Sequence, residues 1–241
     1  MTTTYRPAFY AVSTGSGGVR DWVTVLHPPY TAWHLSYVAI GAALANHFEA
    51  WKLCGALLAF FLAVGVAAHA LDELHGRPLQ TGISSRALIA AAAIGTLVPV
   101  AVGWWYGGLR LLPFIVVGAL LVIAYNLELA GGRFHNGVVF AAGWGAFPVL
   151  TGYYAQDFQL AAPAFIAAGA AFLLSVAQRE LSTRVRELRR RAAEVEGRIV
   201  FADGRVEPLD RDALLVHDEA ALRAIALGMV CLAAALVAWR M

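Results

Sequence analysis

The fold is organised around one stretch, Ala67-Ala-His-Ala-Leu-Asp-Glu-Leu-His-Gly-Arg-Pro78, which ends a long apolar run. Within seven residues the stretch carries four ionisable side chains: His69, Asp72, Glu73 and His75. On a helix, the spacings of three and four residues place the first three of these on one face. Ionisable groups at the end of an apolar span are costly, so they indicate a functional site. The simpler interpretation is that the helix has reached the lipid headgroups, where such residues are ordinary.

The composition is that of a membrane protein. Of 241 residues, 60% are hydrophobic and only 14% are charged, whereas about a quarter are charged in a typical soluble domain. The apolar runs are about 20 residues long and do not alternate, which favours helices over a barrel. Cys54 and Cys231 lie in distant apolar runs, so we expect small buried hydrophobes and not a disulfide or metal pair. The first 26 residues are polar, so no cleavable signal peptide is expected.

The apolar runs predict an all-α, polytopic membrane helix bundle with about seven transmembrane helices. Their expected bounds are roughly 31–46, 53–73, 86–106, 111–129, 137–154, 160–182 and 220–238. The expected domains are a partly flexible cytoplasmic tail (1–26), a transmembrane bundle (27–182), a cytoplasmic Arg-rich helix and hairpin (183–217), and the last transmembrane helix (218–241). Within the tail, Asp21 to Leu26 could form a short interfacial helix.

The distribution of basic residues predicts the orientation. With seven spans and a cytoplasmic N-terminus, only Lys52, Arg110 and Arg240 of the 18 Lys and Arg residues lie outside. The opposite orientation would violate the positive-inside rule. We therefore expect a multi-pass protein of a prokaryotic-type inner or plasma membrane, with the stretch 67–78 facing the cytoplasm.

The segment 183–217 has two expected parts. Apolar residues recur at helical spacing from Leu181 to Val195, which predicts a helical continuation of the sixth span with an Arg-rich face toward the headgroups. Ile199 to Val206 then predicts a hairpin that turns at Asp203-Gly204. The segment is interpreted as a solvated basic linker, with a lid over the cytoplasmic mouth as the alternative.

Three cytoplasmic segments are expected to bring polar side chains to one membrane depth. They contribute His69, Asp72, Glu73, His75 and Arg77, then Tyr125, Asn126, Glu128, Arg133, His135 and Asn136, and finally Gln178, Arg179 and Glu180. Carboxylates can hold a divalent cation and arginines can bind phosphate oxygens, so this set suits a phosphorylated ligand. Apolar spans could enclose a long hydrocarbon tail. The combination favours a polyprenyl or lipid substrate.

These motifs resemble a known family. Ala68-His-Ala-Leu-Asp72, followed by Arg77-Pro-Leu and Gly82-Ile-Ser, resembles the first Asp-rich region of the UbiA superfamily of intramembrane prenyltransferases. Tyr125-Asn-Leu-Glu-Leu and the run from Gly143 to Tyr153 are similar to its fourth and fifth helices. The resemblance covers most of residues 27–190. It implies a UbiA-like bundle that transfers, or cyclises, the prenyl group of an isoprenoid diphosphate.

The resemblance also implies roles for particular residues. The catalytic residues would be Asp72, His69 and Glu73. The substrate would be bound by Arg77, Tyr125, Asn126, Arg133 and Arg179. Mg²⁺ or another divalent cation would be held by Asp72, Glu180 and His69. The implied partners are an isoprenoid diphosphate, a lipid or aromatic acceptor and membrane lipids, without nucleic acid; an oligomer is possible.

Departures from the family pattern leave alternatives open. In the first motif, Ala68, His69 and Gly76 replace an asparagine and two aspartates, and Arg184 replaces an aspartate after the sixth span. The alternative is therefore a catalytically degenerate UbiA-like subunit that binds lipid or assists assembly. A third class is a transporter or a haem or metal carrier that uses His34, unless that side chain is hydrogen-bonded to a neighbouring helix. Trp144 and Tyr153 either line a prenyl tunnel or pack in the core.

Overall fold

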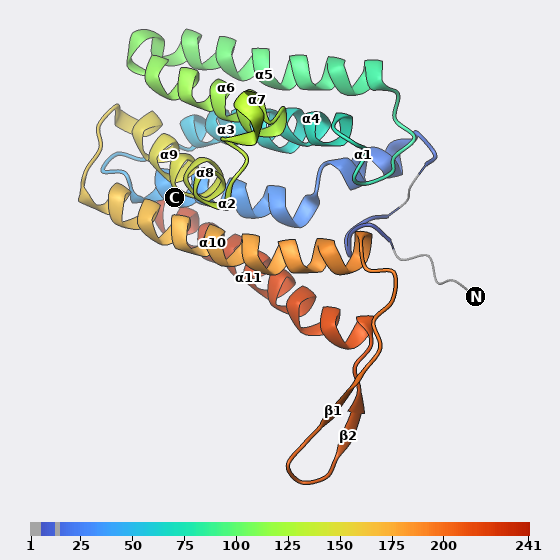
Figure 1. The fold of residues 1–241 in the computed structure, drawn as a ribbon. Coiled ribbons are helices and arrows are strands. Elements are labelled where there is room, and N and C mark those ends of the chain that lie inside the picture. Colours follow the sequence, from blue (N-terminus) through green and yellow to red (C-terminus); the bar gives the residue numbers. More distant parts are fainter. Residues whose placement is uncertain (1–5, 13–14) are drawn as a thin grey trace.

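The computed structural model describes residues 6–12 and 15–241. Seven helical rods follow one another along the chain and form a bundle (Figure 1). The rods are α2 (Pro28–Leu44), α3–η1–α4 (Ala50–Phe60, Phe61–Ala68, His69–Leu74), α5 (Ser85–Gly107), α6 (Leu112–Asn126), α8–η3–α9 (Gly137–Phe140, Ala141–Ala146, Phe147–Asp157), α10 (Ala162–Arg190) and α11 (Arg211–Arg240). The shorter elements are α1 (Val19–Val25), η2 (Gly108–Arg110), α7 (Leu129–Gly132), β1 (Arg198–Val200) and β2 (Val206–Pro208).

Helix α2 is the centre of the bundle. Trp33, Tyr37 and Val38 on this helix are almost completely buried. Its main neighbours are α9 and α11. Gly41 and Gly152 lie where α2 crosses α9, and a Cβ atom at either position would overlap a carbonyl oxygen of the other helix. Small residues let two helix backbones approach closely in a membrane bundle, so these glycines set the α2–α9 distance.

Two rods contain π-helical segments, η1 and η3. Such segments are rare and often occur at functional sites, because they change which side chains and carbonyls face a neighbour. In η3, the carbonyl oxygen of Trp144 is 2.8 Å from Nδ1 of His34 on α2. The interpretation of His34 as hydrogen-bonded to a neighbouring helix is confirmed.

Helices occur at all seven positions where the sequence predicts spans. Five of the rods are long and apolar enough to cross a membrane: α3–η1–α4, α5 with η2, α8–η3–α9, α10 and α11. Helix α6 is apolar but has only 15 residues, and α2 has 17. The chain thus has the build of a helical membrane protein, and the number seven stays a prediction. Cys54 and Cys231 are exposed on the bundle surface, so the expectation of buried cysteines is wrong.

The N-terminal segment is packed against the bundle wherever the structure describes it. Ala8, Ala11 and Val25 are buried beside Leu79 and Ile83 of the loop after α4. Helix α1 matches the predicted interfacial helix. Residues 6–12 of the predicted partly flexible tail pack against that loop through small apolar side chains. The tail residues 1–5 and 13–14 lie outside the described part.

Helix α10 extends to Arg190, so the predicted continuation of the sixth span is confirmed as far as that residue, whereas residues 192–195, which the prediction included, are not helical. The predicted hairpin is also confirmed, with Ile199 opposite Glu207 and Val200 opposite Val206. The hairpin projects from the end of the bundle (Figure 1). The expected direction of the Arg-rich face is wrong for Arg189 and Arg190, since both side chains donate hydrogen bonds to the N-terminal segment.

Candidate functional site

Hydrogen bonds define the two ends of the bundle. At one end, Lys52 donates to the Gln156 carbonyl, Tyr106 to the Ala155 carbonyl and Arg240 to the Asn46 carbonyl. At the other end, α4 with the loop after it and the end of α10 contact the N-terminal segment. We call this second end the basic end, because Arg186, Arg189 and Arg190 lie there. The predicted site residues also lie at the basic end.

Asp72 of α4 faces a small polar cavity of ≈ 30 Å³ at the basic end. The cavity is lined by Pro7, Ala8, Phe9, Tyr10, His27, Tyr30, Asp72, Val185, Arg186 and Arg190. We call it the Asp72 cavity. Its volume suffices for about one or two water molecules. Arg186 and Arg190 line the same cavity and are the charged neighbours of the Asp72 carboxylate there.

Arg186 and Arg190 were missed by the sequence reasoning. The signal was present, because Arg179, Arg186 and Arg190 are spaced by seven and four residues and therefore share one face of α10. The interpretation of residues after 182 as a solvated linker obscured it. Continuation of the helix to Arg190 adds two cations to the site.

Two histidines stack beside the Asp72 cavity. The rings of His27 and His69 are 4.0 Å apart at an angle of 11°. His27 adopts a left-handed backbone conformation, with φ 46°, that turns the chain into α2. Its Nδ1 is 2.9 Å from the hydroxyl of Tyr10. Burial, followed by the neighbouring His69, lowers the pKa of His27 well below its ordinary value, and burial raises the pKa of the Tyr10 hydroxyl. Both side chains are therefore neutral at physiological pH.

A second cluster joins α6 to α10. Arg179 Nη1 donates a 2.5 Å hydrogen bond to the hydroxyl of Tyr125, and its guanidinium lies 5.2 Å from the ring centroid of Phe140. The ring of Tyr125 stacks on His135 at 4.4 Å and lies 4.5 Å from Trp144. Leu71 of α4 packs against the cluster that contains Tyr125, so this cluster lies next to the helix that carries Asp72. The structure thus brings the predicted residues Tyr125 and Arg179 into contact, beside the helix that carries Asp72.

Three other predicted residues are engaged in local structure. Glu73 is fully buried, and its carboxylate accepts hydrogen bonds from the backbone N–H groups of Leu79 and Thr81, each at 2.9 Å, and from the Thr81 hydroxyl. Arg77 donates to the Ile83 carbonyl at 2.6 Å and to the Ser85 hydroxyl at 2.9 Å. The amide of Asn126 donates to the carbonyl four residues earlier in its own helix. Glu73 and Arg77 therefore hold the loop after α4.

The predicted metal ligands do not form a set. Glu180 is exposed, and Nδ1 of His69 lies 3.2 Å from the Gly65 carbonyl oxygen. Within residues 6–12 and 15–241, no three His, Cys, Asp or Glu side chains are close enough to hold a metal ion. Of the three predicted ligands, Asp72 alone lines the Asp72 cavity, which it shares with the cations Arg186 and Arg190. These residues do not fit a bound Mg²⁺ ion. Arg133, a predicted phosphate ligand, is exposed.

An apolar groove of ≈ 260 Å³ lies between α3, α5, α6 and α9. It extends from Trp51 and Tyr106 at the far end of the bundle to Val122 and Trp144. Trp144 thus lines a cavity, while Tyr153 is buried in the core, as the alternative interpretation of that residue expected. Because Trp144 also contacts Tyr125, the inner limit of the groove borders the polar cluster at the basic end.

Comparison with family models, with curated proteins and with solved structures finds no match for this chain. The class of the protein therefore follows from its own features. It is a helical membrane protein with a cluster of arginines, tyrosines and histidines around one half-buried aspartate at one end.

Proposed function

We propose that the protein binds an isoprenoid diphosphate at the basic end of the bundle and transfers its prenyl group, as a divergent UbiA-like prenyltransferase. The observation that carries the proposal is that Arg186 and Arg190 line the same cavity as Asp72, while Arg179, on the same face of α10, donates a hydrogen bond to Tyr125. Guanidinium groups bind phosphate oxygens strongly and with defined geometry. Arg186 and Arg190, about one turn apart on one face of α10, can hold a diphosphate, and Arg179 lies further along that face.

The proposed reaction places the negative charge where the arginines are. When the allylic C–O bond breaks, its electron pair remains on the diphosphate, and positively charged donors stabilise that leaving group. The prenyl cation then forms a bond to a lipid or aromatic acceptor, which gives up a proton, or it cyclises with loss of a proton. The apolar groove that borders Tyr125 at Trp144 supports a hydrocarbon substrate.

The proposal includes seven spans in a prokaryotic-type inner or plasma membrane, with the basic end in the cytoplasm. The basic end carries Arg186, Arg189, Arg190 and the hairpin, whereas the opposite end carries Lys52, Arg110 and Arg240. The positive-inside rule then assigns the cytoplasmic side.

The test is binding and turnover of radiolabelled prenyl diphosphates of several chain lengths by the protein in lipid nanodiscs, with Mg²⁺ or with a chelator. Arg186→Gln is expected to weaken binding about tenfold or more, because a charged hydrogen bond to phosphate is lost. Arg184→Gln is the matched control on the same helix, since Arg184 is exposed and pairs with Asp218. Absence of binding at every chain length would refute the proposal.

A second candidate is the catalytically degenerate subunit, which binds a lipid phosphate without metal-dependent chemistry. The observation that favours it is the arginine environment of Asp72, together with the exposure of Glu180. The same assay separates the two functions. Binding with release of diphosphate supports the enzyme, and Asp72→Ala should then abolish release. Tight binding without release, with or without Mg²⁺, supports the non-enzymatic subunit.

A further inference from the structure

The segment Arg6–Val12 covers the Asp72 cavity. Pro7, Ala8, Phe9 and Tyr10 supply four of its ten lining residues. Phe9 and Tyr30 pack against Val185 and Leu222 of α10 and α11, and Ala8 and Ala11 pack against the loop after α4. The segment therefore closes the cavity from the side of α10 and α11.

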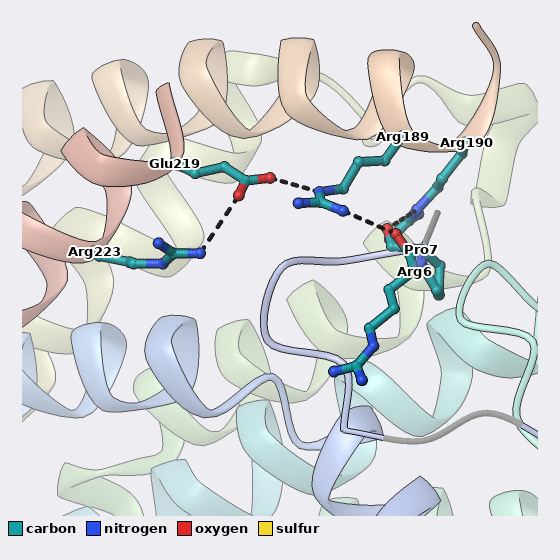
Figure 2. A network of polar contacts seen from close by, with 6 residues as sticks. All are labelled: Arg6, Pro7, Arg189, Arg190, Glu219 and Arg223. Carbon is teal, nitrogen blue, oxygen red and sulfur yellow. Dashed lines mark hydrogen bonds and ion pairs between the residues drawn. The ribbon is translucent and has the colours of Figure 1, made fainter. Parts of the chain in front are cut away.

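The segment is attached to α10 through neutral oxygen atoms. Arg190 Nε donates to the Pro7 carbonyl at 3.0 Å, and Arg189 Nη1 donates to the Arg6 carbonyl at 3.3 Å (Figure 2). In Figure 2, both guanidinium groups point from α10 toward the backbone of the segment. A carbonyl is a weaker partner for a guanidinium than a phosphate or a carboxylate.

The carboxylates nearby do not neutralise Arg190. Glu219 lies between Arg189 and Arg223, at 2.5 and 3.4 Å. The Glu73 carboxylate is occupied by hydrogen bonds from the loop after α4. Among the described residues, the Asp72 carboxylate lies farther from Arg190 than the 4.0 Å that defines an ion pair. Arg190 is thus a half-buried cation whose direct acceptor is a main-chain carbonyl. Burial of a charge is costly when its partner is weak, so an anion that replaces the carbonyl gains free energy.

A further polar group faces the same cavity. His27 is only 9% exposed and lines the cavity, and its Nε2 has no hydrogen-bond partner among the residues that the structure describes. An unpartnered buried nitrogen beside two arginines provides another contact for an oxyanion. The present volume of ≈ 30 Å³ is too small for a phosphate group, so a phosphate needs the segment to move.

We infer that residues 6–12 form a displaceable plug over an anion site. In the closed state, the carbonyls of Arg6 and Pro7 accept the hydrogen bonds that the guanidinium groups would otherwise donate to phosphate oxygens. The site comprises Arg186, Arg190 and His27, with Arg189 at its edge. A diphosphate enters by replacing the carbonyls and releasing the segment. This inference rests on the proposed function, because it assigns a closed state to the same end of the bundle.

The experiment measures exposure of the segment in the full chain with Cys54→Ala and Cys231→Ala. Ala11→Cys places a thiol at a position that is 2% exposed, and Val12→Cys gives a control thiol next to it that is already exposed. Inorganic diphosphate should raise the alkylation rate at position 11 by about fivefold or more and leave position 12 unchanged. Unchanged alkylation at position 11 under saturating diphosphate would overturn the plug.

Two further variants separate the plug from the anion site. Tyr10→Phe removes the hydrogen bond to His27, so inorganic diphosphate should bind about three- to tenfold more tightly, whereas Tyr154→Phe at the far end should have no effect. Arg190→Gln, or Arg186→Gln if the first does not fold, should weaken binding about tenfold.

Absence of diphosphate binding overturns the inference. If a prenyl diphosphate binds without exposing position 11, the plug fails and the proposed function stands. If inorganic diphosphate exposes position 11 but no prenyl diphosphate binds, the plug stands and the proposed function fails.

Discussion

Glu73 is the residue whose role differs most between sequence and structure. The motif places it beside Asp72, where a carboxylate suggests catalysis. In the fold its two oxygens satisfy three donors of the loop after α4. A buried carboxylate with three hydrogen bonds is a structural anchor, and removing one acceptor leaves a donor without a partner. Asp72, which faces the cavity, is then the acidic group left for ligand chemistry.

The variant Glu73→Gln tests this assignment. Its amide nitrogen would face the N–H group of Leu79 or Thr81, so we expect the variant to lose about 1–3 kcal/mol of stability. Thermal unfolding in detergent, followed by tryptophan fluorescence, measures the loss. Glu180→Gln serves as the control, because Glu180 is exposed. A Glu73→Gln protein that unfolds at the wild-type temperature would show that the carboxylate has no anchoring role.

At the scale of elements, the crossing of α2 and α9 decides how the bundle packs. Both helices place a glycine at the contact, and each glycine leaves room for a carbonyl oxygen of the other helix. Helix α10 decides the site, since its extension to Arg190 carries the arginine face to the N-terminal segment. The π-helical segment η3 adds the carbonyl that His34 contacts and directs Trp144 toward Tyr125.

The crossing predicts a difference between two Gly→Ala variants. Gly41→Ala should destabilise the protein by about 1–3 kcal/mol or more, because the added methyl group overlaps the Val149 carbonyl and forces the helices apart. Gly169→Ala on α10 is the matched control, since a Cβ there meets nothing within 4 Å and alanine favours a helix. Unfolding temperatures in the same detergent give the comparison. Equal losses in both variants would argue against the close α2–α9 contact.

At the scale of the whole molecule, charge is distributed unequally between the two ends. The basic end carries the arginines of α10 and the hairpin, and the opposite end carries a few paired cations, such as Lys52 with Glu49. This asymmetry predicts a single orientation in the membrane. In the proposed orientation, the Asp72 cavity faces the cytoplasm.

The orientation can be measured with single cysteines in the chain that lacks Cys54 and Cys231. Asp203→Cys in the hairpin should react with an impermeant maleimide only in inside-out vesicles. Gln159→Cys, in the turn between α9 and α10, should react only in right-side-out vesicles. Both positions are exposed, so accessibility of the side chain does not limit labelling. The reverse pattern would place the basic end outside, and labelling of both from one side would contradict the seven-span topology.

The sequence by itself determined the class of the protein, the order and approximate bounds of its helices, the hairpin at Asp203-Gly204 and the meeting of Tyr125 with Arg179 at one end of the bundle. These features depend on local hydropathy, turn chemistry and chain direction. Only the tertiary structure decided that Glu73 anchors a loop, that Glu180 is exposed and that the N-terminal segment packs over Asp72. Their physical reason is contact between segments distant in sequence: a buried side chain takes the hydrogen-bond partners that packing supplies, and spacing along the chain does not specify those partners.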